Sequence, residues 1–90
     1  MMKYYSVPEM VKELTEFRKS KQQIYQLIKD VEDKTPHRFG RMFLGNYYRK
    51  HQRKQKVVSE RDLVMLKKIL EKEAQGVQRG TLIQHVYGSD

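Results

Sequence analysis

Apolar residues recur along this chain at the spacing of amphipathic helices. The first stripe comprises Val7, Met10, Val11, Leu14 and Phe17. These residues lie three or four positions apart, so they share one side of a helix. We therefore predict a first helix from Val7 to about Arg18, with Pro8 tolerated in its first turn.

A second stripe follows after a very short break. It comprises Ile24, Leu27, Ile28 and Val31. This spacing predicts a second helix from Lys21 to about Glu32. Because only Arg18 and Lys19 separate the first helix from Ser20, the two helices must turn sharply against each other. This order is the outline of a helix-turn-helix.

Two more stripes lie in the C-terminal third of the chain. They comprise Leu63, Leu66, Leu70 and Ala74, and then Leu82, Ile83, Val86 and Tyr87. The spacing predicts a third helix that starts after Ser59 and ends near Gly76, where a left-handed cap is easy. We expect a short fourth helix after Thr81 that stops at Gly88.

Met65 and Ile69 lie beside the stripe of the third helix, about a third to a half turn away from it. Val77, Leu82 and Tyr87 could extend the surface that they form. One interpretation is a contact with a second copy of the chain. The other, which we favour, is that these residues seat the fourth helix in an ordinary core.

The start of each predicted helix carries the same polar signature. The matches to a capping box are Ser6-x-x-Glu9, Ser20-x-x-Gln23, Ser59-x-x-Asp62 and Thr81-x-x-Gln84. In this motif the first side chain accepts a hydrogen bond from the third helical amide, and the third side chain reaches back. Four matches in register with four periodic segments support the helix assignments.

Residues 34–58, between the second and third helices, differ in composition from the rest. They contain Pro36, Gly40 and the pair Gly45-Asn46, with many aromatic and β-prone residues. The sequences RMFL (41–44) and KVV (56–58) predict two short strands joined around residues 45–55. A hairpin that follows a helix-turn-helix is called a wing. The alternative for this segment is a short helix over residues 46–55.

The same segment holds the excess positive charge. The net charge is +8, and residues 34–58 contain eight of the 19 Lys and Arg but none of the 11 Asp and Glu, so the remainder carries 11 of each. A localised excess of this kind is expected on a surface that meets a polyanion. The alternative is a solvated basic loop, but interleaved aromatic and aliphatic residues favour ordered structure and a nucleic-acid partner. The candidate contacts to the nucleic-acid backbone or minor groove are Arg38, Arg41, Arg49, Lys50, Arg53, Lys54 and Lys56.

The exposed side of the predicted second helix carries amides instead of alternating charges. A step of about 100° per residue places Gln22, Gln26 and Lys29 opposite the apolar stripe. A glutamine amide offers the donor and acceptor pair that meets the N6 and N7 edge of adenine in the major groove. The candidate recognition residues are Ser20, Lys21, Gln22, Gln23, Tyr25, Gln26 and Lys29.

The two ends of this helix differ in charge. Ser20, Lys21 and the free amides of the first turn can meet a phosphate oxygen. The acids Asp30, Glu32 and Asp33 collect at the other end. We therefore expect the helix to dock with its N-terminus first, which keeps the acids away from phosphates.

Several classes of protein are disfavoured. The chain has no cysteine, which removes disulfides and thiolate metal sites, and His37, His51 and His85 are too far apart for an HExxH zinc helix. It shows no signal peptide, no apolar run of membrane-spanning length, no nucleophile elbow and no Gly-rich phosphate loop. We expect one non-enzymatic cytoplasmic domain over residues 1–90, without a cofactor, a metal or a membrane partner.

Three stretches of the chain together resemble a known family. They are YSVPEMVKEL, SKQQIYQLIKD and VVSERDLVMLKKILEKEAQGVQRGTLIQHV. They look like the winged-helix DNA-binding domain of the mercury-resistance-regulator (MerR) superfamily and its smaller excisionase relatives. The likeness covers most of the chain.

Individual positions carry this resemblance. Val58, Ser59, Asp62, Leu63 and Leu66 match a pattern that the family writes as Tyr-Ser-x-x-Asp-Leu-x-x-Leu. Gly76 with Leu82 and Ile83 resembles the turn and helix that follow it. In contrast, Arg18 and Lys19 replace the usual glycine of the turn, and the segment between the second and third helices is longer than in the family.

The resemblance implies a stripped-down DNA binder of bacterial, phage or plasmid origin. The chain ends at Asp90, where full-length regulators continue into a dimerising helix and an effector domain, so we expect no small-molecule effector. Excisionases, phage or plasmid repressors, and partition or transfer accessory proteins are of this kind.

These observations predict a mainly α fold with a small β-hairpin, a winged helix-turn-helix of about four helices that binds double-stranded DNA. Since one small domain grips few base pairs, a second copy of the chain is a further candidate partner, as a dimer or a cooperative array. One alternative is an adaptor that binds an acidic protein, for which Tyr47 and Tyr48 beside the basic loop are suited. Another is RNA binding, if those aromatic residues stack on unpaired bases.

Overall fold

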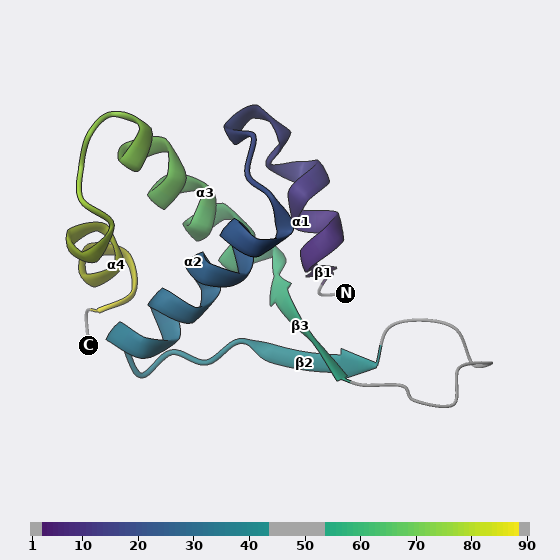
Figure 1. Cartoon of the computed structure of the whole chain (residues 1–90). Helices are drawn as coiled ribbons and strands as arrows, with labels where there is room; N and C mark the ends of the chain where they lie inside the picture. Colours follow the sequence, from purple (N-terminus) through teal and green to yellow (C-terminus); the bar gives the residue numbers. More distant parts are fainter. Residues whose placement is uncertain (1–2, 44–53, 89–90) are drawn as a thin grey trace.

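The computed structural model describes residues 3–43 and 54–88. Within them the chain forms four α-helices, a turn of 3₁₀ helix and a three-stranded antiparallel sheet (Figure 1). The elements in chain order are β1 (Tyr4–Ser6), α1 (Val7–Glu13), the 3₁₀ turn η1 (Thr15–Phe17), α2 (Lys21–Lys34), β2 (Gly40–Phe43), β3 (Lys54–Ser59), α3 (Glu60–Ala74) and α4 (Arg79–Tyr87). The prediction of a mainly helical fold with a small β element is confirmed.

The capping serines start α1 and α2 as predicted. Ser6 accepts from the amide of Glu9 (3.4 Å), and the Glu9 carboxylate accepts from the Ser6 amide (3.0 Å). Ser20 and Gln23 make the same pair of bonds, at 3.2 and 2.8 Å. The backbone hydrogen bond from Ser6, followed by the one from its hydroxyl, lowers the pKa of Glu9. Both helix starts are therefore fixed by residues only three positions apart.

The first helix is shorter than predicted. α1 ends at Glu13, and the chain continues as η1 instead of remaining α-helical to Arg18. The Thr15 hydroxyl donates to the carbonyl of Lys12 at 2.5 Å, and such a side-chain bond competes with the regular helical ladder. The apolar stripe still reaches the core, where Leu14 is buried and Phe17 packs at its edge.

The start of α3 is capped by Ser59, which accepts from the amide of Asp62 at 3.1 Å. The reciprocal bond of the predicted capping box differs, because the Asp62 carboxylate accepts from the Ser59 hydroxyl (3.2 Å) and not from its amide. At the other end, Gly76 adopts the expected left-handed backbone, with φ of 98°.

The fourth helix begins earlier than predicted, so the proposed cap at Thr81 is wrong. Arg79 is its first residue, and Gln78 occupies the N-cap without a side-chain hydrogen bond. The guanidinium of Arg79 donates twice to Glu73 (2.8 Å each) and once to Asp30 (3.2 Å). These contacts with α3 and α2 hold the first turn in place of a local cap.

The two predicted strands form an antiparallel hairpin, with Gly40 opposite Val57 and Phe43 opposite Lys54. Because residues 54 and 55 belong to β3, the alternative helix over residues 46–55 is wrong at its C-terminal end, and the rest of it lies outside the described residues. The sheet also contains β1, which the sequence analysis missed. β1 pairs with β3 on its other edge, Tyr4 opposite Ser59, giving the strand order β1-β3-β2.

One core lies between the helices and the sheet. Its least exposed members are Met10, Ile24, Leu27, Val31, Leu66, Ile69 and Ile83, each 0% exposed. Ile69 and Leu82 are therefore core residues, as we favoured, whereas Met65 and Tyr87 are only partly buried and Val77 is exposed. Ala74 is exposed, so its assignment to the buried stripe of the third helix is wrong. It lies in the last turn of α3, where the chain leaves the core.

Figure 1 shows that the β2–β3 hairpin extends to one side of the helices, whereas α4 and the end of α3 lie on the other side. No helix in the described part of the chain combines the length and the apolar composition needed to cross a membrane.

Candidate nucleic-acid interface

The orientation of α2 is fixed by the residues that it buries. They are Ile24, Leu27, Ile28 and Val31, as predicted, and none is more than 2% exposed. Burial of one such aliphatic side chain stabilises by about 1.5–3 kcal/mol, so rotation of the helix about its axis would be strongly unfavourable. The seven candidate recognition residues are consequently all exposed: Ser20, Lys21, Gln22, Gln23, Tyr25, Gln26 and Lys29.

The three glutamines of α2 have different surroundings. Gln23 is engaged in the capping box with Ser20. The side-chain amide of Gln26 donates to Asp30 at 2.8 Å, one helical turn further on. Gln22 is exposed and has no such intramolecular bond within the described residues. Its amide is therefore the one most available to an external partner.

The turn that leads into α2 has an unusual backbone. Arg18 adopts a left-handed conformation, with φ of 53° and ψ of 41°. The left-handed region costs an L-residue with a side chain about 1–2 kcal/mol, whereas glycine adopts it without this cost. The sharp turn between the helices therefore forms without glycine, at some cost in stability.

The exposed face of α2 borders the hairpin. A shallow cleft of about 320 Å³ is lined by Tyr25, Ile28, Lys29 and Glu32 from α2 and by Arg41 and Lys56 from β2 and β3. With about 100° per residue, Gln22 lies roughly 20° from Lys29 around the helix. Lys29 and Tyr25 therefore border the basic residues of the hairpin, and Gln22 lies on the same side of α2, about 10 Å further toward its N-terminus.

Glu32 fastens α2 to the hairpin. Its carboxylate pairs with the Lys56 ammonium of β3 and accepts from the amide of Phe39 at 3.0 Å. Burial alone would raise the pKa of Glu32, but the hydrogen bonds from Lys56 and Phe39 outweigh it, and the net pKa is lowered. Lys56, predicted as a nucleic-acid contact, therefore has an internal partner.

Arg38, also predicted as a nucleic-acid contact, closes the C-terminal end of α2. One of its guanidinium nitrogens, Nη1, donates to the carbonyls of Glu32 (2.7 Å), Thr35 (2.9 Å) and His37 (2.8 Å). Carbonyls at the end of a helix have no intrahelical donor, and a cation there also complements the helix dipole. The described contacts of Arg38 are thus structural.

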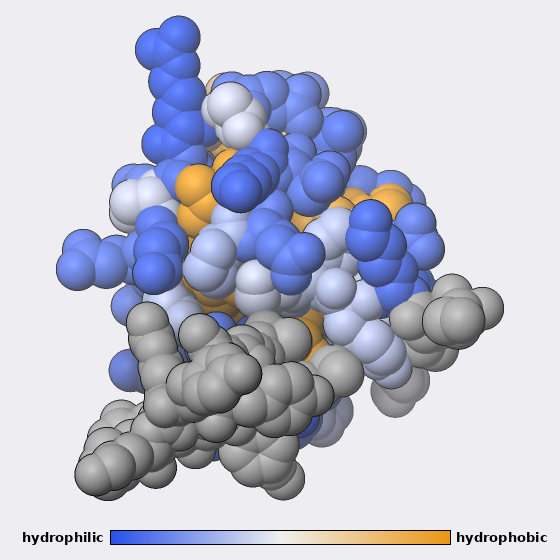
Figure 2. Space-filling view, turned by 90° about the vertical axis from the view of Figure 1, so that its right-hand side faces the viewer, coloured by the Kyte–Doolittle hydropathy of each residue, from blue (hydrophilic) through white to orange (hydrophobic). Residues whose placement is uncertain are grey.

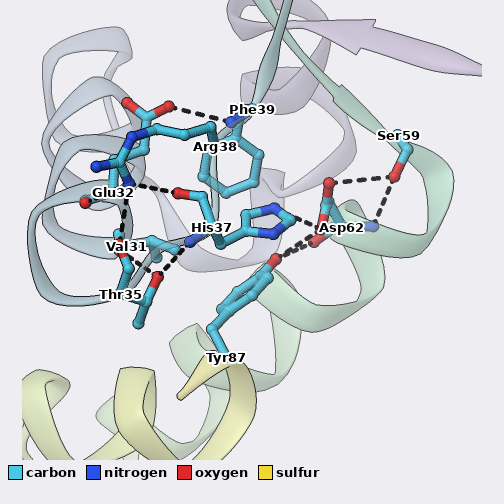
Figure 3. Close-up of polar contacts among 9 residues, drawn as sticks. All are labelled: Val31, Glu32, Thr35, His37, Arg38, Phe39, Ser59, Asp62 and Tyr87. Carbon is cyan, nitrogen blue, oxygen red and sulfur yellow. Dashed lines mark hydrogen bonds and ion pairs between the residues drawn. The ribbon is translucent and has the colours of Figure 1, made fainter. Parts of the chain in front are cut away.

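A polar cluster supports the base of the hairpin (Figure 3). The Tyr87 hydroxyl of α4 donates to Asp62 of α3 at 3.0 Å, and burial, followed by the Asp62 charge, raises the pKa of Tyr87. The His37 ring packs against both Tyr87 and Phe39, with ring centroids 4.7 Å apart in each case. Its Nε2 atom lies 3.3 Å from Asp62 without hydrogen-bond geometry. Through this cluster, α3 and α4 fix the segment between α2 and β2.

The remaining basic candidates divide into two groups. Arg41 is exposed on β2 and borders the cleft. Lys54 begins β3, but its side chain is not described, and Arg49, Lys50 and Arg53 lie outside the described residues. The described part of the hairpin therefore presents Arg41 and the paired Lys56 beside α2.

Figure 2 shows the end of the molecule from which the hairpin extends. Its described side chains are mostly hydrophilic, and hydrophobic ones appear only as small separate areas. The described residues also contain no group of three or more side chains suited to hold a metal ion.

Comparisons of the chain with protein-family models, with curated proteins and with solved structures found no match.

Two features of this surface were missed by the sequence analysis. Glu32 was treated as one of several acids at the far end of α2, yet it positions the hairpin. Its partners, Phe39 and Lys56, follow it by seven and 24 residues, so no helical or strand period connects them. β1 was missed because a three-residue strand is too short for a period-two pattern.

Proposed function

We propose that this chain is a sequence-preferring, double-stranded DNA-binding protein, acting as a small transcriptional regulator or an excisionase-like accessory factor. In this proposal the domain is a winged helix-turn-helix in which α2 enters the major groove and the hairpin lies on the backbone or in the flanking minor groove. The observation that carries it is the cleft where Tyr25 and Lys29 of α2 meet Arg41 of the hairpin. One duplex could contact both elements at once.

The order of the elements supports this proposal. A helix pair with a sharp turn is followed by an antiparallel hairpin, and β1 extends the sheet on the opposite edge of β3. Helix-turn-helix proteins place the N-terminal part of the second helix against the bases. Here that part carries Lys21 and Gln22, both exposed.

Two of the three acids of α2 have partners within the protein, and the third, Asp33, is exposed at the end of the helix away from Ser20. Asp30 accepts from Gln26 and from Arg79, and Glu32 pairs with Lys56. Both carboxylates are thus compensated within the protein, at the end of the helix away from Ser20. A phosphate backbone near the start of α2 would meet cations and free amides instead.

Selection of binding sites from random duplex DNA, read by fluorescence anisotropy on the enriched sequence, tests the proposal. If about five cations neutralise phosphates, we expect the logarithm of the binding constant to fall against log salt with a slope of roughly −4 to −5. The enriched duplex should bind more tightly than scrambled duplex and than the matching single strand. No binding to any duplex at low salt would refute the proposal, and preference for single-stranded RNA would favour RNA binding instead.

The alternative function is an adaptor that binds an acidic protein through the basic segment. It depends on Tyr47 and Tyr48, which lie outside the described residues. The same experiment separates the two, because an adaptor would bind the enriched and the scrambled duplex equally weakly.

A further inference from the structure

A groove of about 760 Å³ is lined by residues of α3 and α4 and by Val77 between them. Figure 1 shows that α4 and the end of α3 lie on the other side of the molecule from the hairpin. We call this groove the α3–α4 groove. Its apolar lining includes Met65, Val77, Leu82 and Val86, while Lys68 and Lys72 stand on its rim. None of these residues belongs to the surface around α2 described above.

The apolar lining of this groove is incompletely covered by the protein. Leu82 is 6% exposed and belongs to the core, but Val77 is 38% exposed, and Met65 and Val86 are half-buried. Val64, one helical turn before Lys68 on α3, is also exposed, at 51%. Contiguous exposed apolar surface with a polar rim is typical of a protein-interaction site.

The rim of the groove is predominantly basic. Lys68 and Lys72 are exposed, lie four residues apart on α3 and form no ion pair within the described residues. Like charges at this spacing disfavour each other, so an anionic partner would relieve their repulsion. His85 on α4 also lines the groove, and Glu71 is the one acidic residue that the described part of the chain places there.

The dimensions of the groove suit a helix. Met65 and Lys72, its first and last lining residues on α3, are separated by about two helical turns, or roughly 11 Å of rise. A helix that binds in such a groove uses apolar anchors at positions i, i+3 or i+4, and i+7. DNA is a poor occupant, because a duplex has no apolar ridge of this kind.

A second copy of this chain is also a poor occupant. In a two-fold symmetric contact each surface faces its own copy, so Lys68 and Lys72 would approach the same lysines. We propose that the α3–α4 groove binds an acidic amphipathic helix of a protein partner. This site would let the domain recruit or be held by another protein while the surface around α2 remains free.

A phage-displayed library of short amphipathic helical peptides, with the residues beside the apolar anchors randomised, tests this inference. We expect enriched peptides to carry Asp or Glu beside anchors at i, i+3 or i+4, and i+7. The double variant Lys68→Glu/Lys72→Glu should bind a synthesised enriched peptide on the order of tenfold more weakly, since two exposed ion pairs would be reversed. Val77→Ser should also weaken binding, because it removes exposed apolar surface without opening the core.

The matched control is Lys12→Glu/Lys67→Glu, which changes the net charge equally at two exposed lysines outside the groove. Thermal unfolding followed by circular dichroism checks that each variant is folded. Equal loss of peptide binding in the groove and control variants would overturn the inference. Enrichment of neutral or basic peptides would also overturn it. So would sedimentation in which the wild-type chain self-associates and the Val77→Ser variant does not, because the groove would then bind a second copy. Duplex DNA binding by Lys68→Glu/Lys72→Glu, measured separately, reports on the proposed function and leaves this test independent of it.

Discussion

Glu32 in the last turns of α2 forms an ion pair with Lys56 of the central strand β3, 24 residues further along the chain. This pair joins the exposed helix face to the hairpin. Both side chains are mostly buried, at 14% and 20% exposed. The orientation of the hairpin relative to α2 therefore depends on a contact that water screens only partly.

Lys56→Met should destabilise the fold by about 1–2 kcal/mol, between the values typical of exposed and of fully buried pairs. It leaves the Glu32 carboxylate without its cation. The control is Lys67→Met, because the Lys67–Glu16 pair is about half exposed on both sides (46% and 56%) and should contribute less than about 1 kcal/mol. Urea unfolding measures both variants, and equal losses would contradict the role given to the Glu32–Lys56 pair.

The same carboxylate should make stability depend on pH. The pKa of Glu32 is below its ordinary value of 4.5 in the folded protein, so the unfolded chain binds its proton first as the pH falls. The contribution of Glu32 to the free energy of unfolding is fully present above about pH 4.5. It is lost as the pH falls through the pKa that Glu32 has in the folded protein. Urea unfolding from neutral to acidic pH should show a smaller loss for Glu32→Gln than for wild type. Parallel curves would show that Glu32 does not contribute.

Arg18→Gly should stabilise the protein, by about 0.5–1 kcal/mol. The left-handed backbone at Arg18 is unfavourable for a residue with a side chain, and glycine relieves this strain. The relief exceeds the entropic cost of fixing glycine, which is more flexible in the unfolded chain. Lys19→Gly is the control, since Lys19 does not have a positive φ and glycine there should destabilise. Midpoints of thermal unfolding that move in the same direction for both variants would argue against backbone strain at Arg18.

Gln22→Ala should change which duplex is preferred, and more so than Gln26→Ala. Gln22 has no intramolecular hydrogen bond within the described residues, whereas Gln26 must release Asp30 before its amide nitrogen can meet a base. A bidentate glutamine contact contributes about 1–3 kcal/mol of discrimination. Anisotropy titrations on the enriched and the scrambled duplex measure this difference in binding free energy. Equal losses on both duplexes for Gln22→Ala would refute base readout at this position.

Lys29→Ala provides the contrast for that experiment. A phosphate contact carries no sequence information, so this variant should weaken binding to all duplexes alike and reduce the salt slope by about one. A change of preferred sequence for Lys29→Ala would mean that the two residues have exchanged roles.

Arg79→Lys should destabilise the protein by about 1–2 kcal/mol, although the charge is kept. The guanidinium bonds to both Glu73 and Asp30, and an ammonium cannot reproduce this fork. Thermal unfolding checks the loss. Lys72→Arg on α3 is the control, because Lys72 is exposed and should tolerate the change.

Much of the helical framework could be predicted because its determinants are local. Ser6 and Ser20 cap helices through residues three positions away, and Ile24 and Leu27 repeat at the helical period. The cap at Thr81 failed for the opposite reason. The start of α4 depends on Arg79 and on acids from two other helices, and no pattern near Thr81 reports them.

The candidate site was predictable only as a set of exposed residues. Periodicity identifies which side of α2 faces outward, and hence that Gln22 and Lys29 are exposed. It does not show that Arg38 has its guanidinium against the end of α2, or that Lys56 is paired with Glu32. Basic residues of one segment look alike in sequence, but their roles diverge once folding places carbonyls and carboxylates beside some of them.

The pairing of β1 with β3 has a consequence for how the chain is made. Tyr4 emerges early from the ribosome but must wait for its partner Ser59, whereas α1 and α2 can pack together as soon as residue 34 is free. Contacts that close such long loops form slowly. A nascent chain halted before β3 would thus expose the helix pair without the sheet against which it packs. Tyr5 and Val7 would then be accessible to chaperones.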